Sequence, residues 1–182
     1  MKFSIGVPCL DSCPCDFAFA LARLAYFAGI SHDEFQLIAP RHYPIPDARN
    51  EIVRQALLNG SSHLLFLDSD MTFPSDTLVR LLAHAKPIAG AYGVKRRFPI
   101  TRCGEPLDKW QDHGLIEMKS MGMAVCLLNL EVFKKLTPPF FAWTEVSEDV
   151  GFCTKARAAG LKIWCDCDLS REIGHIGQHI YQ

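Results

Sequence analysis

The sequence lacks an excess of charge of either sign. Its 19 Lys and Arg residues and 20 Asp and Glu residues leave a formal net charge of −1 over 182 residues. Proteins that bind nucleic acid or anionic membranes through bulk electrostatics carry a clear basic excess, so we exclude partners of that kind. The sequence also lacks the polar bias of disordered chains, since 49% of its residues are hydrophobic.

Long apolar runs are missing as well. The most apolar stretch, 17–30, is interrupted by Arg23, and the apolar run that begins at Phe3 ends at Pro8. A membrane-spanning helix needs about 20 apolar residues, and a secretory signal needs an apolar core of about 7–15. We therefore expect no transmembrane segment and a cytoplasmic location.

The eight cysteines include no CxxC pair, which is the spacing typical of structural zinc sites. Without a secretory signal, a disulfide framework is not expected either. Cys126, Cys153 and Cys165 lie within apolar patterns and are predicted to be buried thiols. The CxxxCxC cluster at 9–15 has no assigned role.

The first half of the sequence alternates between strand and helix patterns. Strands are predicted at 3–8, 35–39, 63–67 and 88–92, and helices at 17–27, 47–58 and 74–86. The first helix is apolar all round and is expected to be largely buried, and Asp47 is expected to cap the second. The continuously apolar strand 63–67 is expected to be a parallel strand buried on both faces. This alternation predicts an α/β fold with crossover helices.

The second half has a different pattern. Strands are predicted at 115–118, 123–129 and 162–165, with a short helix at 131–136 and a longer helix that Ser147 caps and Gly160 ends. We expect this half to extend the sheet and to form one wall of a cleft rather than a separate domain.

The most informative segment is Leu64-Leu65-Phe66-Leu67-Asp68-Ser69-Asp70. Ligands of open α/β sheets bind beyond the carboxyl ends of the strands, and this strand delivers two carboxylates there. Acids at i and i+2 repel each other unless a cation lies between them. Oxygen ligands favour Mg²⁺ or Mn²⁺. The same sequence pattern also fits a capped turn whose acids are solvated.

A second pair of acids, Glu148 and Asp149, follows the predicted cap Ser147. Acids at a helix N-terminus commonly offset the helix dipole. Alternatively, one of the two carboxylates serves as a general base near a bound substrate. The residues themselves leave both interpretations open.

Two further motifs add polar groups. His175 is flanked by glycines in Gly174-His175-Ile176-Gly177, where the backbone can approach a ligand closely and a neutral imidazole would favour Mn²⁺. Arg49 and Asn50 lie near a predicted helix start, a suitable place for a diphosphate or a nucleotide base. The basic run 95–97 could meet phosphate, but solvation is the more common role of such a run.

Taken together and in order, these residues resemble the nucleotide-diphospho-sugar transferases of the GT-A type, close to the family 2 glycosyltransferases. The resemblance covers nearly the whole chain. It rests on ARNEIVRQAL at 48–57, LLFLDSDMTFPSDTLVRLL at 64–82, MGMAVCLLNLEVFKKL at 121–136, SEDVGFCTKARAAGLKIWCD at 147–166 and GHIG at 174–177.

The resemblance implies a GT-A fold, with a Rossmann-like, mixed but mostly parallel sheet flanked by helices. It implies a single domain, 1–182, in which 1–95 binds the nucleotide sugar and 96–182 holds the acceptor and catalytic residues. The chain is short for this class, so we expect the acceptor side to need a partner subunit or a homo-oligomer.

The resemblance also implies roles for single residues. Asp68 and Asp70 would form the DxD motif that holds Mn²⁺ or Mg²⁺ on the donor diphosphate, with His175 as a metal or diphosphate ligand. Asp149, with Glu148 beside it, would be the base that activates the acceptor in inverting members. The implied donor-binding residues are Pro8, Arg49, Asn50, Asp68, Ser69 and Asp70.

The expected activity is therefore the metal-dependent transfer of a sugar from a nucleotide-diphosphate donor to an acceptor hydroxyl, with inversion. The second predicted strand ends at Ala39-Pro40, without the acid that often contacts the base in this family. The nucleotide therefore stays open, with UDP as the default. The sugar and the acceptor, whether glycan, lipid or protein, stay open too.

Two alternatives belong to other classes. The segment 68–72 also spells DxDxT, the phosphatase signature of the haloacid dehalogenase class, with Asp68 as nucleophile and Asp70 as acid and base. That class usually has its motif on the first strand, whereas two strand–helix units precede it here. The second alternative is a nucleotide-sugar-binding module that has no activity.

Overall fold

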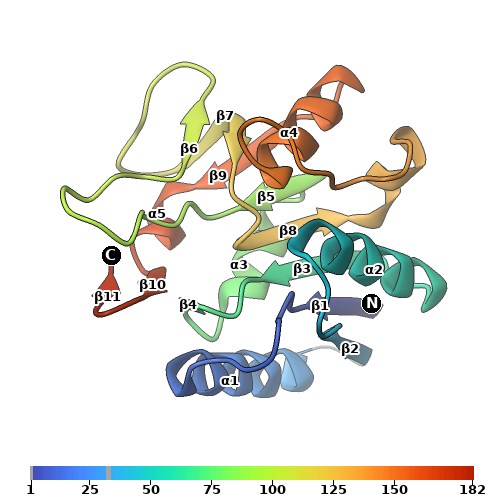
Figure 1. The fold of residues 1–182 in the computed structure, drawn as a ribbon, viewed down its shortest axis with the longest axis horizontal. Helices are drawn as coiled ribbons and strands as arrows, with labels where there is room; N and C mark the ends of the chain where they lie inside the picture. Colours follow the sequence, from blue (N-terminus) through green and yellow to red (C-terminus); the bar gives the residue numbers. More distant parts are fainter. Residues whose placement is uncertain (1, 32–33) are drawn as a thin grey trace.

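A central mixed sheet organises the chain (Figure 1). The computed structural model describes residues 2–31 and 34–182. The strands of this sheet are β1 (Lys2–Gly6), β2 (Glu34–Ile38), β3 (His63–Leu67), β5 (Ile88–Gly90), β6 (Gly104–Pro106), β7 (Leu115–Met121), β8 (Val125–Asn129) and β9 (Ile163–Asp166). Their order across the sheet is β2-β1-β3-β8-β5-β9-β7-β6.

A small antiparallel sheet lies beyond the carboxyl end of β3. It is formed by β4 (Met71–Thr72), β10 (Gly174–Ile176) and β11 (Ile180–Tyr181), in the order β11-β10-β4. Gly174 pairs with Thr72 and His175 with Met71, so this sheet brings the GHIG segment beside the DxD turn. The sequence patterns gave no sign of these three strands because each has only two or three residues.

Helices cover both faces of the central sheet. They are α1 (Cys15–Ser31), α2 (Ile45–Leu58), α3 (Thr77–Ala83), α4 (Glu148–Ala158), α5 (Cys167–Ser170) and a 3₁₀ helix at Leu130–Lys135. One buried cluster joins α1 and α3 to the sheet, and the other joins α2, the 3₁₀ helix and α4. Figure 1 shows α1 and α4 on opposite sides of the molecule.

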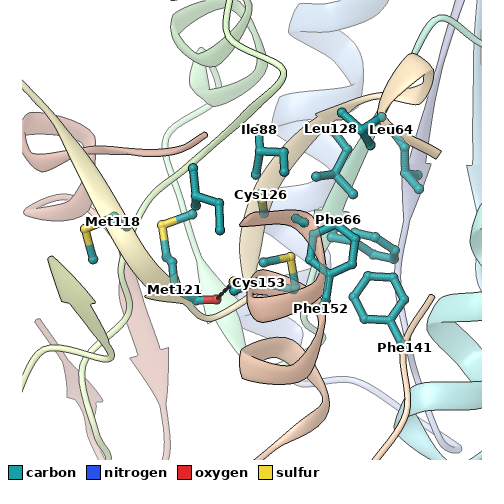
Figure 2. Packing of buried hydrophobic residues seen from close by; sticks show 14 of the residues in the cluster. Leu64, Phe66, Ile88, Met118, Met121, Cys126, Leu128, Phe141, Phe152 and Cys153 are labelled. Carbon is teal, nitrogen blue, oxygen red and sulfur yellow. Dashed lines mark hydrogen bonds between the residues drawn. The ribbon is translucent and has the colours of Figure 1, made fainter. Parts of the chain in front are cut away.

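Alternation along β3 divides its side chains between these two clusters. Leu64 and Phe66 face the α2 and α4 side, whereas Leu65 and Leu67 face α1 and α3. On the first side, Phe141 stacks on Phe152 with ring centroids 4.7 Å apart and meets Phe66 edge-on at 5.6 Å (Figure 2). Both faces of the strand are therefore buried, as its continuous apolar sequence predicts.

One neighbour of β3 differs from the prediction. Strand β3 is parallel to β1, but its other neighbour, β8, runs antiparallel and lies between β3 and β5. An apolar run shows that both faces are covered, and it does not show the direction of the adjacent strand. As a consequence, the two predicted halves, 1–95 and 96–182, share one sheet.

The prediction that the first helix is largely buried is wrong. Among the side chains of α1 that the structure describes, those that are buried form a single stripe, Phe17, Ala20, Leu24 and Ala28. Phe19 and Tyr26 are 66% and 75% exposed. Because α1 packs on the sheet with a single face, apolar residues elsewhere on the helix remain on the surface.

The helix starts were predicted in part. Ser147 caps α4 as expected, and its Oγ accepts a hydrogen bond from the Val150 N–H at 3.4 Å. The prediction that Asp47 caps α2 is wrong, because the helix already begins at Ile45, directly after Pro44. A proline in the first turn needs no N–H partner, and Asp47 lies in that turn, where its charge faces the helix dipole.

Cys126, Cys153 and Cys165 are buried free thiols, as predicted. Cys13 and Cys15 in the CxxxCxC cluster are exposed, and Cys9 is partly buried. Within the ranges that the structure describes, no helix is long and apolar enough to cross a membrane.

Candidate active site

The carboxyl ends of β1 and β3 meet at one edge of the sheet. Gly6 of β1 is in register with Phe66 of β3, and Pro8 and Asp68 each follow two residues later. Pro8 is buried at this position. The close approach of α2 requires a glycine at position 6, because a Cβ there would lie 2.3 Å from Ile52 Cγ2. Ile52 lies about one turn after Arg49 on α2. The fold thus packs this part of α2 against the predicted donor site.

Arg49 forms the centre of the site. It is 2% exposed, and its Nη2 lies 2.9 Å from Asp68 Oδ1 and 3.2 Å from Asp68 Oδ2. Its Nε lies 3.2 Å from Glu148 Oε1, so a single guanidinium joins the turn after β3 to the first residue of α4. These three residues are 19 and 99 positions apart in the chain.

Two aromatic rings and two carboxylates hold this buried charge. The Cζ atom of Arg49 lies 5.3 Å from the ring centre of Phe66 and 6.0 Å from that of Phe141. Burial opposes the charge, but Asp68 and Glu148 outweigh it and raise the pKa of Arg49. Among the described residues, Arg49 Nη1 is buried without a hydrogen-bond partner. The guanidinium therefore retains an unused donor inside the site.

The two carboxylates of the DxD turn have different electrostatic surroundings. Burial raises the pKa of Asp68, and Asp70 and Glu148 add to the increase although Arg49 opposes it. At Asp70, burial is outweighed by His175 and Arg96, which together lower the pKa. At neutral pH, Asp70 is thus the better stabilised carboxylate and lies nearer the surface of the site.

Asp70 contacts two basic side chains. Its Oδ2 lies 3.3 Å from His175 Nε2 and 3.1 Å from Arg96 Nη1. The hydrogen bond with Asp70 raises the pKa of His175, and a contact of 2.7 Å between His175 Nδ1 and the Val94 carbonyl orients the ring. The structure therefore brings together two of the three predicted metal ligands.

The third predicted ligand, Asp68, is turned towards Arg49. No group of three or more His, Cys, Asp or Glu side chains in the described part of the chain is arranged to hold a metal ion. One carboxylate oxygen and one imidazole nitrogen at Asp70 and His175 nevertheless form a donor pair that suits Mn²⁺. The metal site itself stays a prediction.

Asp149 follows Glu148 in the first turn of α4. Its Oδ1 accepts hydrogen bonds from the Ser147 hydroxyl and from the Val150 N–H, the latter at 2.8 Å. Its Oδ2 faces Gly122, where an added Cβ would lie 3.4 Å away. Asp149 is partly exposed, whereas Glu148 is buried against Arg49. The two adjacent acids therefore differ in their access to a substrate.

Asn50 already uses its hydrogen-bonding groups within the chain. Its Nδ2 donates to the carbonyls of Pro46 and Phe141, and its Oδ1 accepts from the N–H groups of Phe140 and Phe141. Asn50 thus fastens the segment at 140–141 to α2. The predicted contact of Asn50 with a nucleotide would require these hydrogen bonds to break. Ser69 lies in the turn between the two acids, partly buried.

Arg96 is a site residue that the sequence analysis did not assign. Solvation was given as the more common role of the basic run 95–97 and phosphate contact as the alternative, and the structure shows Arg96 in contact with Asp70 and donating to the Ile176 carbonyl at 3.2 Å. The position of the run could have indicated a role at the site, because it follows β5, whose carboxyl end lies at the same edge of the sheet as that of β3.

The three aromatic residues near the second half divide into two groups. Phe141 is 1% exposed in the core, and Trp110 packs against the core beside Tyr92 at 5.1 Å, so core packing is their role. Trp143, by contrast, is 65% exposed, six positions before Asp149.

Comparisons by sequence gave no matches. No family model matches the chain, and no curated protein does. Solved structures do match. A197 from STIV aligns over 100% of this chain and 97% of its own, with a TM-score of 0.63 at 14% identity. The Drosophila beta-1,4-galactosyltransferase 7 mutant D211N, in complex with manganese, UDP-Gal and xylobiose, aligns over 97% of this chain and 71% of its own, with a TM-score of 0.56 at 14% identity.

The protein has the GT-A-like glycosyltransferase fold. TarS 1–349 from S. aureus also aligns with this fold, over 86% of this chain and 55% of TarS, with a TM-score of 0.50 at 18% identity. The predicted fold class is therefore confirmed. At these identities the likeness concerns the fold alone, and the activity must be argued from the residues at the site.

Proposed function

We propose that this protein is a metal-dependent glycosyltransferase that moves a sugar from a nucleotide-diphosphate donor, UDP-sugar by default, to an acceptor hydroxyl with inversion. One observation carries the proposal. The DxD turn and the start of α4 converge on the buried Arg49 at the carboxyl edge of a GT-A-like sheet. Ligands bind at this edge in open α/β sheets.

On the donor side, Asp70 and His175 would hold Mn²⁺ or Mg²⁺ together with Asp68. The bound cation would neutralise charge on the departing diphosphate as a Lewis acid. Arg96 lies against Asp70 and is half exposed, so it can exchange that carboxylate for a phosphate oxygen. Pro8 would line the nucleotide pocket, since it follows β1 as Asp68 follows β3.

On the acceptor side, Asp149 would act as the general base. Its Oδ2 makes none of the hydrogen bonds that orient Oδ1, so this oxygen is the one that takes the acceptor proton. Glu148 would be a positioning residue, because it holds Arg49 and thereby fixes the start of α4. Trp143, exposed in the loop before α4, would stack on the acceptor.

The proposed reaction is a single displacement. The acceptor oxygen forms the new bond to the anomeric carbon while the bond from that carbon to the diphosphate oxygen breaks. The electron pair leaves with the nucleotide diphosphate, and the acceptor proton moves to Asp149. With the base opposite the leaving group, the anomeric configuration would invert.

Thermal-shift measurements test the donor assignment. UDP, GDP, CDP and their sugars are each added with Mn²⁺ and with EDTA, and we expect one nucleotide series to stabilise the protein only with the metal. If no nucleotide stabilises it in a metal-dependent way, the proposal fails. If a nucleotide sugar binds but is never turned over, and Asp149→Asn changes nothing, a non-catalytic binding module is the better description.

A further inference from the structure

A hollow lies at the edge of the central sheet opposite to the edge that carries the candidate active site. Four segments meet there, since His63 begins β3, Asn129 ends the antiparallel β8, Pro87 precedes β5 and Leu161 lies shortly before β9. They enclose a cavity of about 730 Å³. Small-molecule sites in proteins typically span about 300–1,000 Å³, so the volume suits one small ligand.

The walls of this cavity are mostly apolar. The apolar side chains are those of Val79, Leu82, Ala83, Pro87, Val132 and Leu161. Buried ligand surface against such walls is the main source of affinity at small-molecule sites, and a few polar groups fix the orientation. The walls therefore favour a ligand with an apolar body.

Two lysines give the cavity a positive charge. Lys86 and Lys135 both line it, and neither forms an ion pair with any residue that the structure describes. The Nζ of Lys86 lies 4.6 Å from the ring centre of Trp164, a contact that leaves its charge uncompensated by any acid. An anionic group in the cavity would be attracted by both lysines.

The remaining titratable groups of the lining leave this charge in place. Glu131 is paired with Lys134 at 2.7 Å, so its negative charge is already balanced. Burial lowers the pKa of His63, which favours the neutral ring at neutral pH. The net charge that faces a ligand is therefore positive.

We infer that this cavity is a binding site for a small anionic molecule with an apolar body, separate from the proposed donor site. The inference does not depend on the proposed glycosyltransferase activity, because none of the residues that line the cavity belongs to the carboxylate edge.

Calorimetry with two probes of equal chain length tests the sign of the charge. Decanoate and decyltrimethylammonium have the same apolar tail and opposite heads. We expect decanoate to bind at one site per chain, at least about tenfold more tightly than the cationic probe, and to weaken in high salt. Equal affinity for the two probes, or the lack of saturable binding of decanoate, overturns the inference.

Two pairs of variants test the location. Ala83→Phe places a ring in the cavity from the exposed last residue of α3 and should abolish decanoate binding, whereas Ala18→Phe on exposed α1 should not. Lys135→Glu should weaken binding about fivefold or more by replacing attraction with repulsion, with Lys109→Glu as the exposed control.

Circular dichroism and size-exclusion chromatography accompany each variant. Unchanged decanoate binding by Ala83→Phe contradicts the location. A concentration-dependent dimer that Ala83→Phe disrupts would show that a second copy of the chain fills the hollow, and this result also overturns the inference.

Discussion

His63 at the start of β3 and Asp68 just beyond its end are about 17 Å apart, five steps of roughly 3.3 Å each, and face different surroundings. At its start, His63 lines a mostly apolar cavity together with two lysines that form no ion pair with any described residue. Beyond its end, Asp68 and Asp70 meet two arginines and a histidine. The four residues Leu64–Leu67 between them are fully buried. A short apolar strand thus separates a negatively charged site from a positively charged one without an intervening domain.

The largest expected effect concerns Asp149, the proposed general base on the acceptor side of the candidate active site. Asp149→Asn should lower the rate of sugar transfer by about 10²–10⁴-fold, because the general base is lost. Metal-dependent nucleotide binding should remain, since Asp149 is not among the proposed metal or donor ligands. The measurement is transfer rate beside nucleotide affinity, with the exposed Glu145→Gln as control. Retained transfer in Asp149→Asn would refute the assignment of the base.

The next effect concerns Arg49, which joins Asp68 and Glu148 beyond the carboxyl end of β3. Arg49→Met keeps the length of the side chain but leaves Asp68 and Glu148 without their shared cation. Removing one partner of a buried ion pair costs about 3–5 kcal/mol, and we expect about 3 kcal/mol because Asp68 keeps 27% of its side chain exposed. At this chain length the melting temperature should fall by roughly 6–12 °C.

Arg54→Met is the matched control for that prediction. Arg54 lies on the same helix and pairs with Glu51 at 2.6 Å, but it is exposed. Exposed pairs contribute little to stability, so urea unfolding of this variant should resemble that of the wild type. Similar losses in Arg49→Met and Arg54→Met would contradict the central role of Arg49.

A smaller effect is expected at Asp70, one of the proposed metal ligands. Asp70→Asn removes one of the two donors that already face each other and should weaken the Mn²⁺-dependent binding of the preferred nucleotide about tenfold or more. In EDTA, Asp70→Asn and the wild type should bind the nucleotide with nearly the same residual affinity. Isothermal titration with and without Mn²⁺ measures the difference, and Asp76→Asn, in the loop before α3, serves as control. Equal losses with and without the metal would argue against Asp70 as a ligand.

The smallest effect concerns the apolar end and depends on pH. Burial holds the pKa of His63 in the folded protein below that in the unfolded chain, about 6.5. Because the unfolded chain binds the proton more readily, the wild type should lose stability relative to His63→Gln as the pH falls below about 6.5, and the loss should level off below the folded pKa. Urea unfolding at pH 8 and pH 5 checks this. A pH-independent difference between the two proteins would show that the ring is not buried in its neutral form.

Most of the central fold could be predicted from local patterns. Continuous apolar runs gave β3, and the cap at Ser147 gave the start of α4, because both signals involve residues next to each other in the chain. The direction of β8 could not be predicted, since an apolar strand fits a parallel or an antiparallel neighbour equally well.

The positions of the site residues were predicted better than their contacts. Ligands of open α/β sheets bind beyond the carboxyl ends of the strands. Pro8, Asp68 and Asp70 were therefore expected at the same edge of the sheet, and they lie there. The interaction of Arg49 with Asp68 and Glu148 depends on how α2 and α4 pack, and nothing in the spacing 49, 68, 148 indicates it. The same holds for the hydrogen bonds that Asn50 forms with the backbone of Phe140 and Phe141, about 90 residues away.

The position of β8 has a consequence for how the chain folds. Within the central sheet, β5 is the next strand after β3 in sequence, yet the two do not pair with each other and each pairs with β8, which begins only at Val125. Until the polypeptide has been made to about Asn129, β3 has an open apolar edge of the kind that promotes association between chains. Pairing at such sequence separations is also slow. We therefore expect fragments that end before Val125 to aggregate, and folding on the ribosome to await the second half of the chain.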